Sequence, residues 1–156
     1  MAIFLVQHGI SAPGETDSQK ILTQKGEEQT RLIAGVAKNY GIFPEKFIHS
    51  GKTRAAQTAG IFHESLNKNA AMEAWQGLGP MDDVRAFAEK LTPELHLMAV
   101  GHLPFMERLI SFLTAGTENI RVFKCQNSGI ICLDAEPSED GGQDWFVKWS
   151  LSPVIT

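Results

Sequence analysis

Apolar residues in this chain fall into short runs and into segments with helical spacing. The short runs are rich in β-branched, aromatic and aliphatic residues, which predicts buried strands. Three such runs lie at 2–7, 46–50 and 94–101. Near the C-terminus, residues 129–134 and 145–151 alternate or run apolar on either side of a turn-rich connection at 136–143, which predicts a hairpin.

Between these runs the apolar spacing predicts four helices. Thr23 has the chemistry of an N-cap for the first, and Gly41 that of the residue just past its end. Its expected apolar face consists of Leu32, Ile33, Val36, Ala37 and Tyr40. The other helices are expected at 53–66, at 80–91 and from Pro104 onward. The segment 10–21 carries turn-forming residues and predicts a loop.

The order of these elements predicts the fold class. Strand, helix, strand, helix, helix, strand, helix and a final strand pair indicate an α/β protein: a three-layer sandwich whose mainly parallel central sheet is flanked by helices. A length of 156 residues and the absence of a linker-like or repeated segment predict one domain over residues 1–156.

Composition narrows the possible functions. Hydrophobic residues make up 43% and charged residues 21%, as in soluble globular proteins. The net charge of −4 does not favour nucleic acid, so a phosphorylated partner has to be attracted by a local positive site. The apolar N-terminus lacks a basic start and is too short to span a bilayer, so we expect a cytoplasmic protein without a membrane role.

Metals and disulfides do not enter the expected chemistry. The two cysteines, Cys125 and Cys132, are too few for a disulfide scaffold and lack neighbouring residues at zinc-ligand spacing. We interpret them as reduced thiols, and we expect neither a metal nor another cofactor.

Chemistry-bearing residues follow three of the predicted strands. His8 follows the first, Arg54 lies just beyond the second, and His102 follows the third. Because ligands of open α/β sheets bind outside the carboxyl ends of the strands, we expect these side chains to meet at one edge. The two following helices, which begin near Thr53 and Pro104, aim free N–H groups at the same edge.

This combination suits phosphoryl transfer. A neutral imidazole is a nucleophile, a protonated imidazole donates to a phosphoryl oxygen, and a guanidinium matches two phosphate oxygens. We therefore expect the pocket to bind a phosphate or sulfate ion. Each residue alone also fits a structural role, and only their joint occurrence indicates a site. The remaining histidines are interpreted as incidental: His49, His63 and His96.

Four short motifs carry a family resemblance. Residues 5–9, Leu-Val-Gln-His-Gly, are similar to an Arg-His-Gly signature, and residues 50–59 resemble Ser-x-x-x-Arg-Ala-x-Gln-Thr. Residues 100–104 and the Leu-Thr-x-x-Gly of 22–26 resemble two further motifs of the same family. The chain thus resembles the histidine phosphatase superfamily, which has the phosphoglycerate mutase-like fold. Its short length and its ending are similar to those of the SixA-type phosphohistidine phosphatases.

The resemblance implies a metal-independent hydrolase. It implies that His8 becomes phosphorylated, that Arg54 and His102 bind the transferring group, and that the substrate is phosphohistidine on a phosphotransfer or phosphocarrier protein in signal transduction. The family has a phosphate-binding arginine where this chain has Gln7. Two alternatives therefore stay open: a phosphate- or phosphoprotein-binding module with catalysis weakened by Gln7, and a phosphatase for small phosphate esters.

The general acid is a second departure from larger family members. Asp82 or Asp83 could serve as a proton donor, although capping of the next helix explains either residue equally well. Phosphohistidine needs a weaker acid than an alkyl ester does, because its leaving imidazole accepts a proton near neutral pH. The short segment between Gly9 and Leu22 also predicts an open site that admits a histidine on a protein surface.

Overall fold

A computed structural model describes residues 1–14 and 16–156, without the side chain of Ser18. Within these residues, six strands form one sheet in the order β3-β2-β4-β1-β5-β6. The neighbouring pairs β3–β2, β2–β4 and β4–β1 are parallel, and β5 and β6 are antiparallel. The strands are β1 (Ile3–Gln7), β2 (Lys46–His49), β3 (Ala71–Ala74), β4 (Leu97–Gly101), β5 (Ile130–Pro137) and β6 (Gln143–Leu151).

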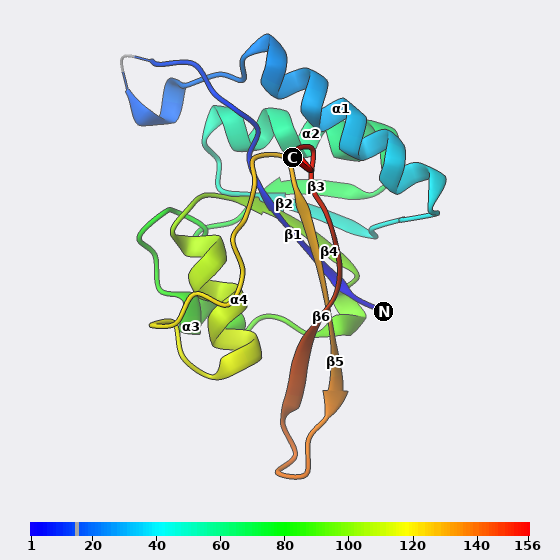
Figure 1. Cartoon of the computed structure of the whole chain (residues 1–156), viewed down its shortest axis with the longest axis vertical. Helices are drawn as coiled ribbons and strands as arrows, with labels where there is room; N and C mark the ends of the chain where they lie inside the picture. Colours follow the sequence, from blue (N-terminus) through cyan, green and yellow to red (C-terminus); the bar gives the residue numbers. More distant parts are fainter. Residues whose placement is uncertain (15) are drawn as a thin grey trace.

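Helices cover both faces of the sheet (Figure 1). One layer holds α1 (Gln24–Asn39) and α2 (Thr53–Leu66), and the other holds α3 (Val84–Ala88) and α4 (Phe105–Ala115). The predicted fold class, a mainly parallel sheet between two helical layers, is therefore confirmed. The β5–β6 hairpin, also predicted, extends beyond the sheet in Figure 1.

Side-chain alternation along β1 explains why its sequence is apolar without interruption. Phe4 and Val6 lie in the core beneath α1 and α2, whereas Ile3 and Leu5 lie in the core beneath α3 and α4. All four are buried. A strand covered on both faces has no polar side, so its pattern is a continuous apolar run instead of an alternation.

The first helix has the expected ends but only part of the expected face, of which Ile33 and Ala37 are buried. Thr23 accepts a hydrogen bond from the Gly26 N–H, as an N-cap does, and Gly41 follows the helix with φ 74°. However, Leu32 and Tyr40 are 56% and 77% exposed. The helix instead packs through its smaller residues, because α1 lies directly against α2. Its buried residues are Gly26, Thr30, Ile33, Ala34 and Ala37.

Three local expectations were wrong. β3 was not predicted, because all four of its residues are exposed and it is a strand only through pairing with β2. The helix expected at 80–91 covers only Val84–Ala88, because Asp83 caps it four residues into the expected range. The strand expected from residue 94 begins at Leu97, after the short 3-10 helix η2 (Pro93–Leu95).

The parallel strands bring their carboxyl ends to one edge. Gln7 pairs with Gly101 across β1 and β4, and the His8 N–H donates to the Gly101 carbonyl at 3.0 Å. His49 pairs with Val100 across β2 and β4. The three connections that follow β1, β2 and β4 therefore begin side by side. No helix in the described part of the chain is long and apolar enough to cross a bilayer.

Candidate active site

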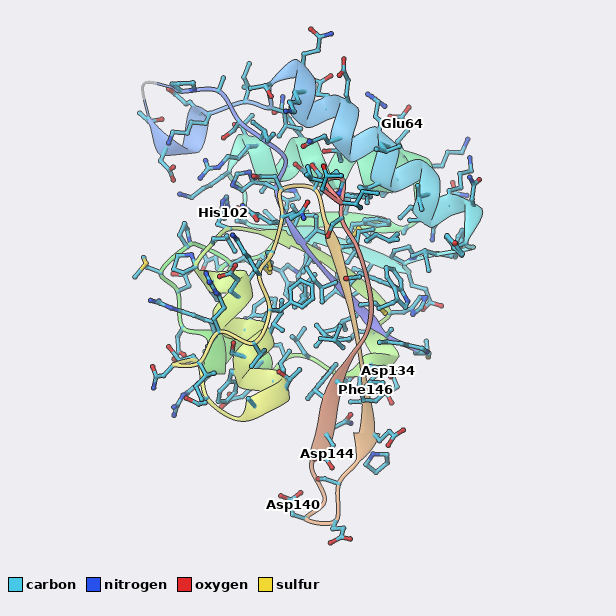
Figure 2. The ribbon with its side chains drawn as sticks, in the orientation of Figure 1. Glu64, His102, Asp134, Asp140, Asp144 and Phe146 are labelled. Atoms are coloured by element: carbon cyan, nitrogen blue, oxygen red, sulfur yellow. The ribbon has the colours of Figure 1, made fainter. Side chains whose placement is uncertain are left out.

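His8 and His102 lie next to each other at this edge. Their ring centroids are 5.0 Å apart at an interplanar angle of 51°. In Figure 2, His102 lies between the layer of α1 and α2 and the layer of α3 and α4. Arg54, in the first turn of α2, reaches the same place, with its Nε 3.2 Å from His8 Nε2. The structure thus brings together the three residues that the sequence predicted to meet.

Two neighbours fix the tautomer of His8. Its Nδ1 lies 2.7 Å from the Gly9 carbonyl oxygen, which can only accept, so Nδ1 carries the proton. Arg54 Nε can only donate, so Nε2 presents a lone pair. The pKa of His8 is lowered, chiefly because burial disfavours the charged ring, and the charges of Arg54 and two lysines act in the same direction. His8 is therefore held as a neutral imidazole with a nucleophilic Nε2.

His102 is also neutral at physiological pH. Its Nε2 lies 2.6 Å from Ser50 Oγ, and its Nδ1 is buried without a hydrogen-bond partner in the described part of the chain. Burial and the neighbouring His8 and Arg54 lower its pKa to about 3. This low pKa is that of the protein without a bound phosphoryl group; donation by a protonated His102 to a phosphoryl oxygen stays a prediction. The neutral ring carries one N–H, and the direction of the hydrogen bond with Ser50 decides which nitrogen holds it.

Arg54 is buried but keeps its charge paired. Only 5% of the residue is exposed. Its Nη2 donates to Asp17 Oδ1 at 3.0 Å, and its Nη1 donates to the Asp17 backbone carbonyl at 2.5 Å. Asp17 begins the short 3-10 helix η1 (Asp17–Gln19), which lies in the predicted loop. This ion pair was missed, because nothing in the local sequence marks which residue of a loop turns back to the site.

The Oε1 atom of Gln7, which lies directly before His8 in the chain, is buried and forms no hydrogen bond among the described residues. Gln7 lines a cavity of about 660 Å³ together with Leu103, Lys25 and Lys124, among others. The sequence placed Gln7 among the phosphate-binding residues, and among the described contacts no hydrogen bond joins its Oε1 to His8, Arg54 or His102.

The end of the second motif attaches α2 to the His8 connection. Thr58 Oγ1 accepts from the Gly9 N–H at 3.0 Å and donates to the Arg54 carbonyl at 2.8 Å. Gln57 Oε1 accepts from the Leu22 N–H at 2.9 Å. Both residues were quoted in the motif but given no role. The Gln-Thr pair therefore holds the backbone that carries His8 against the helix that carries Arg54.

A second set of contacts fixes His8 from the other side. Asn127 Nδ2 donates to the His8 carbonyl at 2.8 Å. The hydroxyls of Thr30 and Ser128 form a buried hydrogen bond of 2.7 Å, and both lie next to Gly9. A Cβ at Gly9 would lie 3.0 Å from each hydroxyl, so a larger residue here would have to push these side chains aside. No sequence signal separated Asn127 or Ser128 from ordinary turn residues.

The two aspartates considered as proton donors both accept hydrogen bonds from nearby backbone N–H groups. Asp83 accepts from the Arg85 N–H at 2.9 Å at the start of α3. Asp82 Oδ2 accepts from the Gly79 N–H at 2.7 Å. The capping interpretation is thus confirmed for Asp83, and neither carboxylate has a hydrogen bond to His8 or His102 among the described contacts.

The remaining histidines have local structural contacts. His63 Nε2 lies 2.8 Å from the Ala70 carbonyl, and His96 Nδ1 accepts from the Ala2 N–H at 3.3 Å. His49 Nδ1 accepts from the Gly51 N–H at 3.1 Å, so this residue shapes the connection that leads to Arg54. These contacts agree with the incidental roles expected for them.

The described side chains do not form a set of metal ligands. Among the described residues, no group of three or more His, Cys, Asp and Glu side chains is placed to hold a metal ion. Cys125 and Cys132 are free and buried, as expected. Burial raises the pKa of the Cys125 thiol to about 12 and that of the Cys132 thiol to about 11, so both are inert thiols at neutral pH.

Comparison with known proteins gives relatives over the whole chain. No protein-family model matches. The chain is 29% identical to phosphohistidine phosphatase SixA of Escherichia coli strain K12, over 98% of this chain and 94% of that protein. It is 32% identical to an uncharacterised protein of Picosynechococcus over 67% of each chain. The solved structure of the protein histidine phosphatase SixA with tungstate is similar with a TM-score of 0.80 and 25% identity, covering 98% of this chain and 97% of that chain.

Proposed function

We propose, from the premise that this chain belongs to the histidine phosphatase superfamily and to its SixA type, that it is a phosphohistidine phosphatase. The reaction removes a phosphoryl group from a histidine on a protein and needs no metal. One observation carries the proposal. The Nε2 lone pair of His8 lies between the Arg54 guanidinium and the His102 ring, which are groups that bind and stabilise phosphoryl oxygens.

The first step transfers the phosphoryl group to the protein. His8 Nε2 attacks phosphorus, so an N–P bond forms on His8 while the substrate's N–P bond breaks. The electron pair of the broken bond stays on the substrate imidazole, which leaves neutral when its other ring nitrogen carries a proton. The Gly9 carbonyl, which accepts from His8 Nδ1, stabilises the positive charge that develops on the His8 ring.

Arg54 also controls access to the His8 Nε2 lone pair in this step. In the free protein its Nε–H occupies the direction of the His8 Nε2 lone pair at 3.2 Å. When the phosphoryl group enters, the guanidinium exchanges this contact for phosphoryl oxygens and releases the lone pair for attack. Neutral His102 donates its one N–H to another oxygen, and the dianion beside it raises the His102 pKa from about 3.

The second step returns the enzyme to its starting state. A water oxygen attacks the phosphorus on His8, the N–P bond breaks, and the product leaves as H₂PO₄⁻, which carries both protons of the water and can lose one to solvent. His8 Nε2 recovers its lone pair. The relative solved with tungstate, a tetrahedral oxyanion, supports a pocket of this kind.

The substrate class follows from leaving-group chemistry. Asp82 and Asp83 each accept a hydrogen bond from a nearby backbone N–H, and neither is hydrogen-bonded to His8 or His102 among the described contacts, so we infer no carboxylic acid committed to protonating an alkoxide. An imidazole leaving group has no such requirement. We therefore propose phosphohistidine on a phosphotransfer or phosphocarrier protein as the substrate, in preference to small phosphate esters.

The test is turnover of a ³²P-labelled phosphohistidine protein and covalent labelling of the enzyme. Wild type should release orthophosphate and carry an acid-labile label on His8. His8→Ala should lose both label and turnover by at least about three orders of magnitude, as expected when a nucleophile is removed. His63→Gln, a histidine of α2 away from the site, serves as the matched control and should keep both.

Three outcomes would contradict the proposal. Turnover by His8→Ala at the wild-type rate would exclude His8 as the nucleophile. Tight binding of the phosphoprotein by wild type, without release of phosphate, would make this chain a binding module whose catalysis is lost at Gln7. Hydrolysis of an aryl phosphate without hydrolysis of phosphohistidine would favour the ester phosphatase.

A further inference from the structure

One carboxylate lies among three cations beside His8. Asp17 pairs with Arg54 Nη2 at 3.0 Å, with Lys52 Nζ, and with Lys20 Nζ at 3.6 Å. The Arg54 side chain is only 6% exposed and that of Lys52 24%, whereas the Asp17 side chain is 49% exposed. Arg54 and Lys52 are thus the more buried partners, and the Asp17 carboxylate that contacts them is half exposed to solvent.

We propose that Lys52 is a second phosphate-binding cation of this site and that the Asp17 carboxylate occupies the position of the substrate's phosphoryl oxygens until substrate displaces it. The inference rests on the proposed function and deepens it. The cation supplied by the family arginine at position 7 comes instead from the connection after β2.

Charge accounts for the first half of the proposal. Gln7 contributes no charge, and its Oε1 has no partner among the described residues. Lys20, Lys52 and Arg54 together carry three positive charges against one negative charge on Asp17 and one on Asp82, which also acts on Lys52. Removal of Asp17 leaves an excess that suits a dianionic phosphoryl group at close range. In this proposal Lys52 therefore supplies the positive charge that Gln7 does not.

The backbone holds Lys52 where this role requires it. Lys52 is the N-cap residue of α2, two positions before Arg54. Its N–H donates to Ser50 Oγ at 3.3 Å, and the same oxygen lies 2.6 Å from His102 Nε2. Lys52, Ser50 and His102 are thus linked in one short chain of contacts. The pKa of Lys52 is lowered by burial and by the charge of Arg54, partly offset by Asp82, so an incoming anion relieves the repulsion between the two cations.

The nature of the Asp17 contact accounts for the second half. A carboxylate offers two oxygens to Arg54 and Lys52, which is the same acceptor chemistry that a phosphoryl group offers. A half-exposed ion pair contributes little net stability, because water and mobile side chains compete with it. A dianion with three oxygens can therefore replace the carboxylate, and Asp17 then moves to solvent.

The experiment measures the dissociation constant of inorganic phosphate or orthovanadate by titration calorimetry at low salt. Lys52→Met should weaken binding about tenfold or more, because it removes a charge-assisted contact. Asp17→Asn should tighten binding several-fold, because it removes the competing anion. Lys46→Met, a lysine whose ion pair with Glu73 lies on β2 and β3, is the matched control and should leave the constant unchanged.

A double variant tests the replacement directly. Gln7→Arg should recover part of the affinity lost in Lys52→Met and should gain less when Lys52 is present. Unchanged binding in Lys52→Met would overturn the proposal, as would weaker binding in Asp17→Asn. Lys52→Gln and a thermal melt of each variant separate lost binding from lost folding.

Turnover of a phosphohistidine protein is measured separately with wild type. Failure of turnover with the expected binding series would remove the proposed function and leave the role of Lys52 intact. Normal turnover together with unchanged phosphate binding in all variants would support the proposed function and remove the role of Lys52.

Discussion

Two hydrogen-bonding atoms determine the tautomer of His8. A carbonyl acceptor at Nδ1 and a guanidinium donor at Nε2 leave the ring no other neutral tautomer. The position of that ring depends on Thr58, whose hydroxyl accepts from the Gly9 N–H and donates to the Arg54 carbonyl. A side chain that never reaches substrate therefore holds the nucleophile and the phosphate-binding arginine at a fixed separation.

Replacement of Thr58 tests this positioning role. Thr58→Val keeps the shape and leaves the buried Gly9 N–H without an acceptor, which should lower the free energy of unfolding by about 1–3 kcal/mol. The rate of His8 labelling should fall about tenfold or more, because small misplacements of reacting groups are costly. Urea denaturation and single-turnover labelling measure the two effects, and Thr58→Ser should restore both. A Thr58→Val protein with full labelling rate would show that the hydroxyl does not position His8.

The start of α1 explains the Leu-Thr-x-x-Gly motif at the scale of an element. Thr23 Oγ1 accepts from the Gly26 N–H at 3.0 Å, while the Thr23 N–H donates to the Ile10 carbonyl at 2.9 Å. The helix therefore begins against the backbone that continues from His8 and Gly9. A Cβ at Gly26 would overlap the Ile10 carbonyl oxygen, so only glycine permits this approach.

Two glycines of the same helix make a matched pair. Gly26→Ala should destabilise the protein by roughly 1–3 kcal/mol, because the backbone of α1 and of residue 10 must separate. Gly35→Ala has open space around its Cβ and should stabilise by up to about 1 kcal/mol through helix propensity. Denaturant titration of the two variants gives the comparison. Equal effects in both would mean that the close approach at Gly26 does not restrain the helix.

At the scale of the whole molecule, the sheet separates two cores and brings uncharged imidazoles to its edge. The pKa of His102 is about 3 and that of His8 is lowered, chiefly by burial. Below about pH 6.5, the unfolded chain binds protons that the folded chain does not. Acid therefore favours the unfolded state through these two residues before most carboxylates titrate.

Stability should consequently fall as pH decreases. Between about pH 6.5 and pH 5, His102 alone should reduce the free energy of unfolding by up to roughly 2 kcal/mol. Above about pH 7 this contribution is complete and should not change further. Urea denaturation across this range measures the slope. His102→Gln should reduce the slope, whereas the control His63→Gln, at a position in α2 away from this edge, should keep it. An identical slope in all three proteins would be inconsistent with a neutral buried His102.

The sequence by itself determined the class of fold and the meeting of His8, Arg54 and His102. Continuous apolar runs specify strands buried on both faces, and the carboxyl ends of parallel strands share one edge whatever their exact bounds. Short-range chemistry was also readable, as in the capping by Thr23 and Asp83. These features depend on periodicity and on neighbours a few residues apart.

Only the tertiary structure decided the partners within the site. Asp17 meets Lys52 and Arg54, and Thr58 meets Gly9, across 35 to 49 positions of sequence. The neutral state of His102 depends on burial by several elements at once, and β3 is a strand only because β2 lies beside it. Such contacts arise from packing between segments that are distant in the sequence. The local pattern of apolar and polar residues does not indicate which distant residue will become a neighbour.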